Sequence, residues 1–305
     1  MTSPEWPPLP FDDWETTCDT VHMWTQIVGK TRMALAPPEN HWWHVPLYVT
    51  PRGLGTSSIP YGPIAFDVEF DFVAHNLRIR TSAGGGHNIP LYPRSVADFY
   101  NEYMAALRSL RIEVALHCVP VEFDDPTPFD QDRHHVSYDK AAVESFRRVL
   151  LASDRVFKQF RGHFQGKCSP VHFFWGSFDL AVSRFNGRPA PPRPGIDAVT
   201  AEAYSHEVIS CGFWPGDRRF RHAAFYSYTV PAPPGLDRQA VRPGAAHWNS
   251  QLGEFILEYE DARAAAEPGE AVLEFCQSTY EAGATLAKWD RDALERDAPG
   301  AEAAG

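Results

Sequence analysis

The sequence has few of the features that mark secreted, membrane or metal-knuckle proteins. Only five cysteines occur among 305 residues; they are scattered and form no CxxC pair, so neither a disulfide framework nor a zinc knuckle is expected. No apolar run approaches the length of a membrane span, and the start lacks the basic and apolar regions of a signal peptide. These absences predict a cytoplasmic protein with reduced thiols and no membrane partner.

Positive charge is also scarce. The formal net charge is −11, and no cluster of Lys and Arg stands out. A protein that binds nucleic acid usually needs a basic face to displace counterions from phosphate. Nucleic acid is therefore not an expected partner.

Aromatic residues, by contrast, are abundant. They make up 13% of the chain, and hydrophobic residues make up 44%, which is enough for a sizeable core in one large domain or two smaller ones. Aromatic side chains build cores and also line pockets, so the count alone favours neither use.

The first half of the sequence has clear helix and strand patterns. Phe66, Val68, Phe70 and Phe72 alternate with acidic residues, which predicts one strand of an antiparallel hairpin. Ser95, with Asp98 three residues later, has the form of a helix-capping box. The expected elements are helices at 16–35 and 95–110 and strands at 42–50, 64–72, 77–80 and 111–123.

A loop rich in Pro and Asp at 124–135 precedes a second series of elements. Asp139 is placed to cap a long helix. The Pro- and Gly-rich stretch 186–203 is expected to be an exposed, mobile loop. The expected elements are helices at 139–164 and 269–289 and strands at 169–185, 204–214, 222–231 and 253–260.

These patterns predict an α+β fold with antiparallel sheets and helices packed on one face. The two series favour two similar α-β-β-β-α halves, an N-terminal half at 1–125 and a C-terminal half at 126–295, followed by a disordered tail at 296–305. An internal repeat would place His41 on His172, although the strand expected within 111–123 has no counterpart in the second half.

Several short segments carry a resemblance to a known family. They are NHWWHV, YVTPRGL, SVADFY, SPVHFFWGSFDLAVSRF, SHEV and GFWPG, and they span nearly the whole chain. The sequence resembles a family of bacterial proteins that is catalogued only as a domain of unknown function. The resemblance implies a single full-length unit and brings no activity, cofactor or catalytic residue.

Histidines beside aromatic residues suggest a metal site. Neutral imidazole is a common ligand for zinc or iron, and the candidates are His41, His44, His172 and His206. His41 and His44 are three residues apart, so in a regular strand they would point to opposite faces unless a turn intervenes. Glu207 is the substitute ligand or catalytic carboxylate. No strict metal motif such as HExxH is present, and hydrogen-bonded core histidines are the plain alternative.

A second hypothesis needs no metal. Aromatic side chains could wall a pocket for a small organic or cationic molecule. Asp179 could pair with a histidine, and Arg184 could bind a substrate carboxylate or pair with Asp179. Ordinary core packing and a surface ion pair are the alternatives for these residues. The candidate substrate-binding residues are Trp42, Trp43, Phe174, Trp175 and Trp214.

Three functions therefore stay open from the sequence. The first is an enzyme that uses a divalent metal, zinc or iron, on histidines to act on a small organic molecule. The second is a metal-free small-molecule binding protein, or a hydrolase-like enzyme with a His–carboxylate pair. The third is an interaction protein with a partner or its own homodimer.

Overall fold

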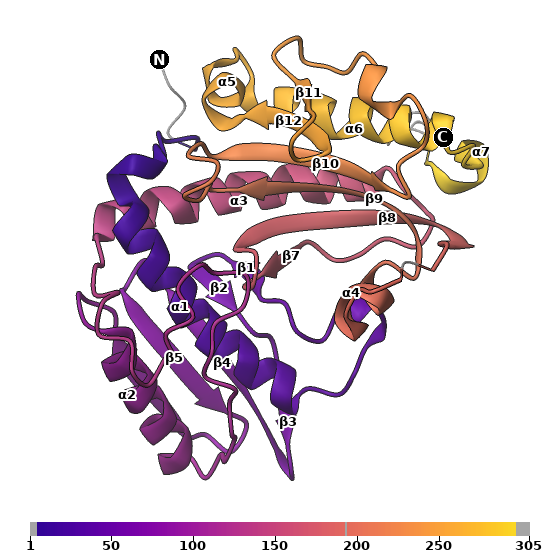
Figure 1. Cartoon of the computed structure of the whole chain (residues 1–305). Coiled ribbons are helices and arrows are strands. Elements are labelled where there is room, and N and C mark those ends of the chain that lie inside the picture. Colours follow the sequence, from indigo (N-terminus) through magenta and orange to yellow (C-terminus); the bar gives the residue numbers. More distant parts are fainter. Residues whose placement is uncertain (1–4, 193, 297–305) are drawn as a thin grey trace, which may run out of the picture.

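Two antiparallel six-stranded sheets, each with its own helices, form the described part of the chain (Figure 1). The computed structural model describes residues 5–192 and 194–296, so nearly all of the expected tail lies outside the described residues. The fold is α+β, as the sequence predicts. None of the helices in the described ranges is both long enough and apolar enough to cross a membrane.

The first sheet is a meander with one strand off its main path. Its order is β1-β2-β4-β5-β6, and β3 pairs with β4. Phe66 and Phe70 are buried as their alternation predicts, and β4 and β5 pair as the expected hairpin. The strands are β1 (Tyr48–Thr50), β2 (Gly53–Gly55), β3 (Ile59–Tyr61), β4 (Ile64–Asp71), β5 (Asn76–Thr81) and β6 (Gly86–Pro90).

The helices of the first half are α1 (Phe11–Leu35) and α2 (Val96–Ser109). A 3-10 turn, η1 (Asn40–Trp42), lies between α1 and β1. The α1 and α2 helices contact each other, and α1 crosses in front of the first sheet in Figure 1. The Ser95 hydroxyl accepts a hydrogen bond from the Asp98 N–H at 3.1 Å, which confirms the predicted cap.

The second sheet has the order β11-β12-β10-β9-β8-β7. Its strands are β7 (His172–Phe174), β8 (Asp179–Pro189), β9 (His206–Trp214), β10 (Ala224–Val230), β11 (His247–Asn249) and β12 (Glu254–Glu258). Helices α3 (Lys140–Gly162) and α6 (Pro268–Leu286) pack together against one face of this sheet. We call that face the helix-covered face and the opposite one the open face. The shorter helices are α4 (Ala198–Ala203), η2 (Leu236–Arg238), α5 (Tyr259–Ala264) and α7 (Arg291–Leu294).

Three expected elements differ in the structure. The strand expected at 42–50 begins only at Tyr48, after the 3-10 turn of η1. The strand expected at 169–185 is a hairpin, since a turn at residues 175–178 separates β7 from β8. The loop expected at 186–203 contains the end of β8 and helix α4, whose N-terminus is capped by Asp197.

The segment 111–123, which was expected to be a strand, forms no strand and bends at residues 119, 121 and 122. Its backbone groups bond to polar side chains of α1 instead of to a neighbouring strand. The Gln26 side chain donates to the Val121 carbonyl at 2.8 Å and accepts from the Val121 N–H at 2.9 Å. Lys30 Nζ donates to the carbonyls of His117 and Val119. A period-two pattern cannot distinguish these two ways of satisfying an extended backbone.

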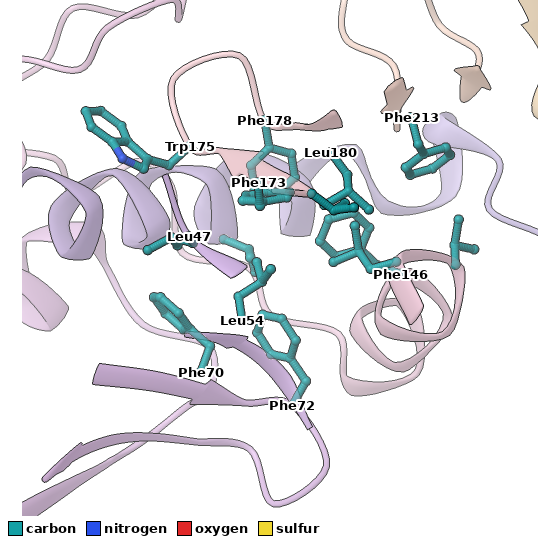
Figure 2. Packing of buried hydrophobic residues seen from close by; sticks show 14 of the residues in the cluster. Leu47, Leu54, Phe70, Phe72, Phe146, Phe173, Trp175, Phe178, Leu180 and Phe213 are labelled. Atoms are coloured by element: carbon teal, nitrogen blue, oxygen red, sulfur yellow. The ribbon is translucent and has the colours of Figure 1, made fainter. Parts of the chain in front are cut away.

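A single bridge joins the two sheets. Leu47, just before β1, pairs antiparallel with Phe173 of β7, and their backbone N–H and carbonyl groups exchange hydrogen bonds of 2.9 and 2.8 Å. Both side chains are fully buried in one continuous hydrophobic core. Figure 2 shows Leu47 and Leu54 from the first half facing Phe146, Phe173 and Leu180 from the second. The core therefore spans both halves.

The N-terminal segment also crosses between the halves. Trp6 is 2% exposed and packs against the rings of Phe225 and Tyr259, with ring centroids 6.1 and 6.3 Å away. The Tyr259 hydroxyl donates to the Pro7 carbonyl at 2.6 Å. The residues that precede α1 are thus part of the packing of the second half.

The two halves share a general order of helix, antiparallel strands and helix. The edge strands β1 and β7 of the two sheets lie next to the Leu47–Phe173 bridge. The second sheet departs from a simple meander, because β12 and not β11 pairs with β10. The expected equivalence of His41 and His172 is wrong, because His41 lies in η1 and His172 lies in β7. The internal duplication and the domain boundaries stay predictions.

Candidate functional site

A tight turn positions the first pair of histidines. His41 and Trp42 both have positive φ, 57° and 61°, a conformation that non-glycine residues adopt at a cost in backbone strain. This turn separates the two imidazoles. The His44 ring stacks near Trp42, with centroids 5.2 Å apart, and its Nδ1 accepts from the Glu39 N–H at 3.1 Å. His41 points instead toward the second half of the chain.

Both ring nitrogens of His41 are occupied. Nδ1 lies 3.1 Å from the carbonyls of Glu202 and Ala203, so it carries the proton and donates to the end of α4. Nε2 lies 2.7 Å from Lys167 Nζ and therefore accepts from the ammonium. Burial first, and then the Lys167 charge, hold the pKa of His41 below its usual value. His41 is thus a neutral residue that connects α4 to the second sheet.

His172 lies close to His41 but has a different environment. Its side chain is fully buried, and neither Nδ1 nor Nε2 has a hydrogen-bond partner in the structure. The rings of Tyr48 and Trp43 lie 5.5 and 6.0 Å from it between centroids. Burial, followed by the charges of Arg32 and Arg161, lowers the pKa of His172 to about 3. A buried imidazole with two unsatisfied nitrogens is uncommon and costs free energy.

A cavity opens where the two sheets separate beyond the Leu47–Phe173 bridge. Its volume is about 290 Å³, and we call it the junction cavity. One residue past the bridge, Tyr48 and His172 face each other, and Tyr48 also lines the cavity. His172 itself points to the open face, because it pairs with Ala181, which is two residues from Asp179 on β8. The junction cavity is lined by Tyr48, Val49, Asp154, Lys158, Arg161, Pro170 and Val171.

Cations surround this junction. The guanidinium of Arg32 lies over the Tyr48 ring, 4.9 Å from its centroid, and donates to the Pro46 carbonyl. Arg161 Nε donates to the Ser169 carbonyl at 2.7 Å. Among the residues that the structure describes, these two hydrogen-bond to carbonyl and hydroxyl oxygens, not to carboxylates. In a chain with net charge −11, such unpaired cations are a distinctive feature.

His206 and Glu207 lie near each other in sequence but serve separate contacts. The rings of His206 and His41 lie 5.6 Å apart between centroids, so the structure does bring these two together. His206 Nδ1 lies 3.0 Å from the Ser205 hydroxyl. Glu207 instead accepts hydrogen bonds from Asn186 and from Arg188 Nη2, at 2.5 and 2.6 Å. Glu207 is therefore a member of a surface ion pair.

Asp179 and Arg184 lie on opposite faces of the second sheet, because they are five residues apart on β8. The expected pairing of the two is wrong. On the open face, buried Asp179 accepts hydrogen bonds from the hydroxyls of Ser177 and Tyr226, and burial raises its pKa. The partners of Asp179 are therefore hydroxyl groups and not the histidine that was expected to pair with it.

On the helix-covered face, Arg184 is fully buried. Its guanidinium lies 3.4 Å from the ring centroid of Phe160 and 4.3 Å from that of Tyr280. It donates to the Phe160 carbonyl. Burial lowers its pKa. Arg184 holds α3 and α6 to the sheet and is closed to a substrate carboxylate.

The expected aromatic pocket is dispersed. Trp43 adjoins His41 and His172, and Phe174 lies 5.6 Å from His172 between ring centroids. Trp175 is buried in the core and donates its indole N–H to the Val45 carbonyl at 2.8 Å. Trp214 stacks on Phe220 at the far end of the open face. Of the five candidates, Trp43 and Phe174 thus lie beside His172, and Trp42 lies beside His44.

Metal ligation has little support from this geometry. Within residues 5–192 and 194–296, no group of three or more His, Cys, Asp or Glu side chains is arranged to hold a metal ion. His41 would have to break existing hydrogen bonds to offer either nitrogen. The zinc or iron site stays a prediction from the sequence.

Gly212 makes room on the open face for Tyr226, whose hydroxyl donates a hydrogen bond to Asp179. Tyr226 of β10 reaches across β9 above Gly212 to Asp179, and a methyl group at position 212 would overlap the Tyr226 ring. We expect Gly212→Ala to displace Tyr226 and to lower the free energy of unfolding by about 1–3 kcal/mol, which urea denaturation would measure.

The control for this change is Gly244→Ala, because a methyl group there meets nothing within 4 Å. We expect that variant to stay within about 0.5 kcal/mol of the wild type. Equal stability of the two variants would show that the Tyr226 ring does not depend on the absence of a side chain at position 212.

Sequence reasoning missed the cations and Tyr48. Lys30 and Arg32 are cations within α1, a helix that is buried along most of its length. Charged residues within such a helix were the one sequence signal for this group. Nothing in the spacing of Tyr48, Arg161 or Lys167 indicates that they meet. They come together only through the junction of the two sheets.

A comparison with protein families gives one match. The model described as "Family of unknown function (DUF5996)" matches residues 6–296, nearly the whole chain. No curated protein and no solved structure matches.

Proposed function

We propose that this chain, which belongs to that family of unknown function, binds a small organic molecule in the junction cavity without the help of a metal. The observation that carries the proposal is His172, a fully buried imidazole whose two nitrogens lack partners. Buried polar groups almost always have a partner, and those that lack one are often found where a ligand binds.

Tyr48 connects the cavity to this imidazole. Tyr48 is half-buried and lines the cavity, and its ring centroid lies 5.5 Å from that of His172. The proposal requires the Tyr48 side chain to move, so that a polar group of a bound molecule can reach His172 from the edge of the sheet. Apolar atoms of Val49, Pro170 and Val171 provide the contact area that ligand sites usually combine with a few polar groups.

Other functions have less support. The metal-dependent enzyme needs ligands that the junction does not offer together, and the second candidate for chemistry, Asp179, is occupied by two hydroxyl groups. The interaction protein and the homodimer stay predictions, as does the cytoplasmic location. Binding in the junction cavity needs no rearrangement of the fold beyond side chains.

The proposal is tested with three probes of similar size: benzyl alcohol, benzoate and benzylamine. Titrations of protein labelled with 13C and 15N at His and Tyr are followed by NMR. We expect at least one probe to shift the His172 and Tyr48 resonances saturably. In His172→Phe its affinity should fall about tenfold, because a hydrogen bond to the ligand is lost.

His87→Phe is the matched control, since His87 is exposed on β6. It should bind the same probe as tightly as the wild type does. If neither these three probes nor phenyl phosphate shifts Tyr48 and His172 saturably, the proposed function is wrong. The same conclusion follows if His172→Phe binds as tightly as the wild type.

A further inference from the structure

We infer that the ligand of the junction cavity is an organic anion, with a carboxylate or phosphate group on an aromatic or apolar body. The inference rests on the proposed function and specifies its ligand class. It comes from the charges at the cavity, which differ in sign from the charge of the chain as a whole.

Arg161 is the residue best placed to bind the anion. It lines the cavity, and its Nε donates to the Ser169 carbonyl, which fixes the side chain. The planar guanidinium has further N–H groups, and such groups bind carboxylates and phosphates with defined geometry. Arg161 is on the solvent-exposed side of α3, so an anion can reach it from outside.

The acidic residue of the cavity is already neutralised. Asp154 lies 2.6 Å from Lys158 Nζ, and both residues line the cavity. Among the described lining residues, Lys158 and Arg161 contribute two positive charges and Asp154 one negative charge, which leaves a net charge of +1. Arg32, behind the Tyr48 ring, adds a second cation that is not paired with a carboxylate.

The interior of the site also suits an anion. Burial first, and then the charges of Arg32 and Arg161, lower the pKa of His172, so an anion bound at Arg161 would offset part of that repulsion. The Tyr48 ring and the side chains of Val49 and Val171 would contact the apolar body of the ligand.

The experiment compares four probes on the full chain by NMR titration: benzoate, phenyl phosphate, benzyl alcohol and benzylamine. We expect the tighter of the two anions to bind roughly tenfold better than benzyl alcohol, because charge-assisted hydrogen bonds are stronger than neutral ones. Benzylamine should bind least. The bound anion should also raise the pKa of His172.

Two substitutions change the cavity charge in opposite directions. Arg161→Gln should weaken the anion about tenfold and leave benzyl alcohol unchanged. Asp154→Asn should strengthen anion binding. Arg238→Gln, at an exposed position on η2, is the control and should change neither. Thermal unfolding confirms that each variant is folded.

The outcomes separate the two proposals. Preference for either benzoate or phenyl phosphate supports the inference and identifies the anionic group. The inference is overturned if benzyl alcohol or benzylamine binds as tightly as both anions, or if Arg161→Gln leaves anion affinity unchanged. If benzyl alcohol then binds the wild type but not His172→Phe, the proposed function, binding of a small organic molecule, is still supported. Absence of binding by all four probes would overturn both.

Discussion

Phe173→Ala is expected to lower the free energy of unfolding by about 3–5 kcal/mol, as large-to-small changes of buried Phe residues do. Phe173 is fully buried, and its ring lies 5.2 Å from that of Phe178 and 6.3 Å from that of Phe146, between centroids (Figure 2). The backbone of the same residue forms the bridge with Leu47. The void left by the substitution would therefore lie at the point where the two sheets are joined.

Urea denaturation of purified protein measures this effect, and Phe174→Ala is its matched control. Phe174 is the next residue of β7, on the open face, and only half-buried. Its loss removes less packed surface, so we expect a cost below about 2 kcal/mol. Similar losses for the two variants would show that the core does not continue through Phe173.

Acid is expected to destabilise the protein through His172. The pKa of this residue is about 3 in the folded chain, against about 6.5 in an unfolded one. Below pH 6.5 the unfolded chain therefore binds a proton that the folded chain does not. The resulting loss of stability is absent above pH 6.5 and grows as the pH falls toward 3. At about 1.4 kcal/mol per pH unit, it reaches about 3 kcal/mol at pH 4.

Comparison with His172→Phe isolates this contribution. His22, whose pKa burial lowers to about 4, acts in the same direction. Glu254, whose pKa burial raises to about 7, acts in the opposite direction. Both contributions are common to the two proteins. Urea denaturation at pH 7, 5.5 and 4 should show that the variant loses about 3 kcal/mol less than the wild type between pH 7 and pH 4. Parallel pH profiles would mean that His172 titrates normally in the folded protein.

The sequence predicts elements well where one residue pattern determines them. The alternation through Phe66 to Phe72 and the caps at Ser95 and Asp139 depend on neighbours along the chain, and all are confirmed. The segment 111–123 shows the limit of such patterns. The strand expected there is wrong, because the partners of this segment are side chains of α1, which are distant in sequence, and not a neighbouring strand.

The candidate site was predicted only in part, for a similar reason. His41, Trp43, His172 and His206 were selected because histidines beside aromatic residues are typical of binding sites, and they do lie together. Their roles depend on groups that no spacing indicates. Lys167 donates a hydrogen bond to His41, whereas burial, together with the charges of Arg32 and Arg161, lowers the pKa of His172. Asp179 and Arg184 lie on different faces of β8, which their five-residue spacing within one strand already implies.

The packing of Trp6 has a consequence for how the protein is made. Trp6 leaves the ribosome well before the rings that bury it, Phe225 and Tyr259, which follow it by more than 200 residues. Domains generally fold in the order of synthesis, but Trp6 cannot pack until Phe225 and Tyr259 have been synthesised. A nascent chain that stops before Phe225 would therefore expose Trp6 to chaperones and proteases, however completely its first sheet had formed.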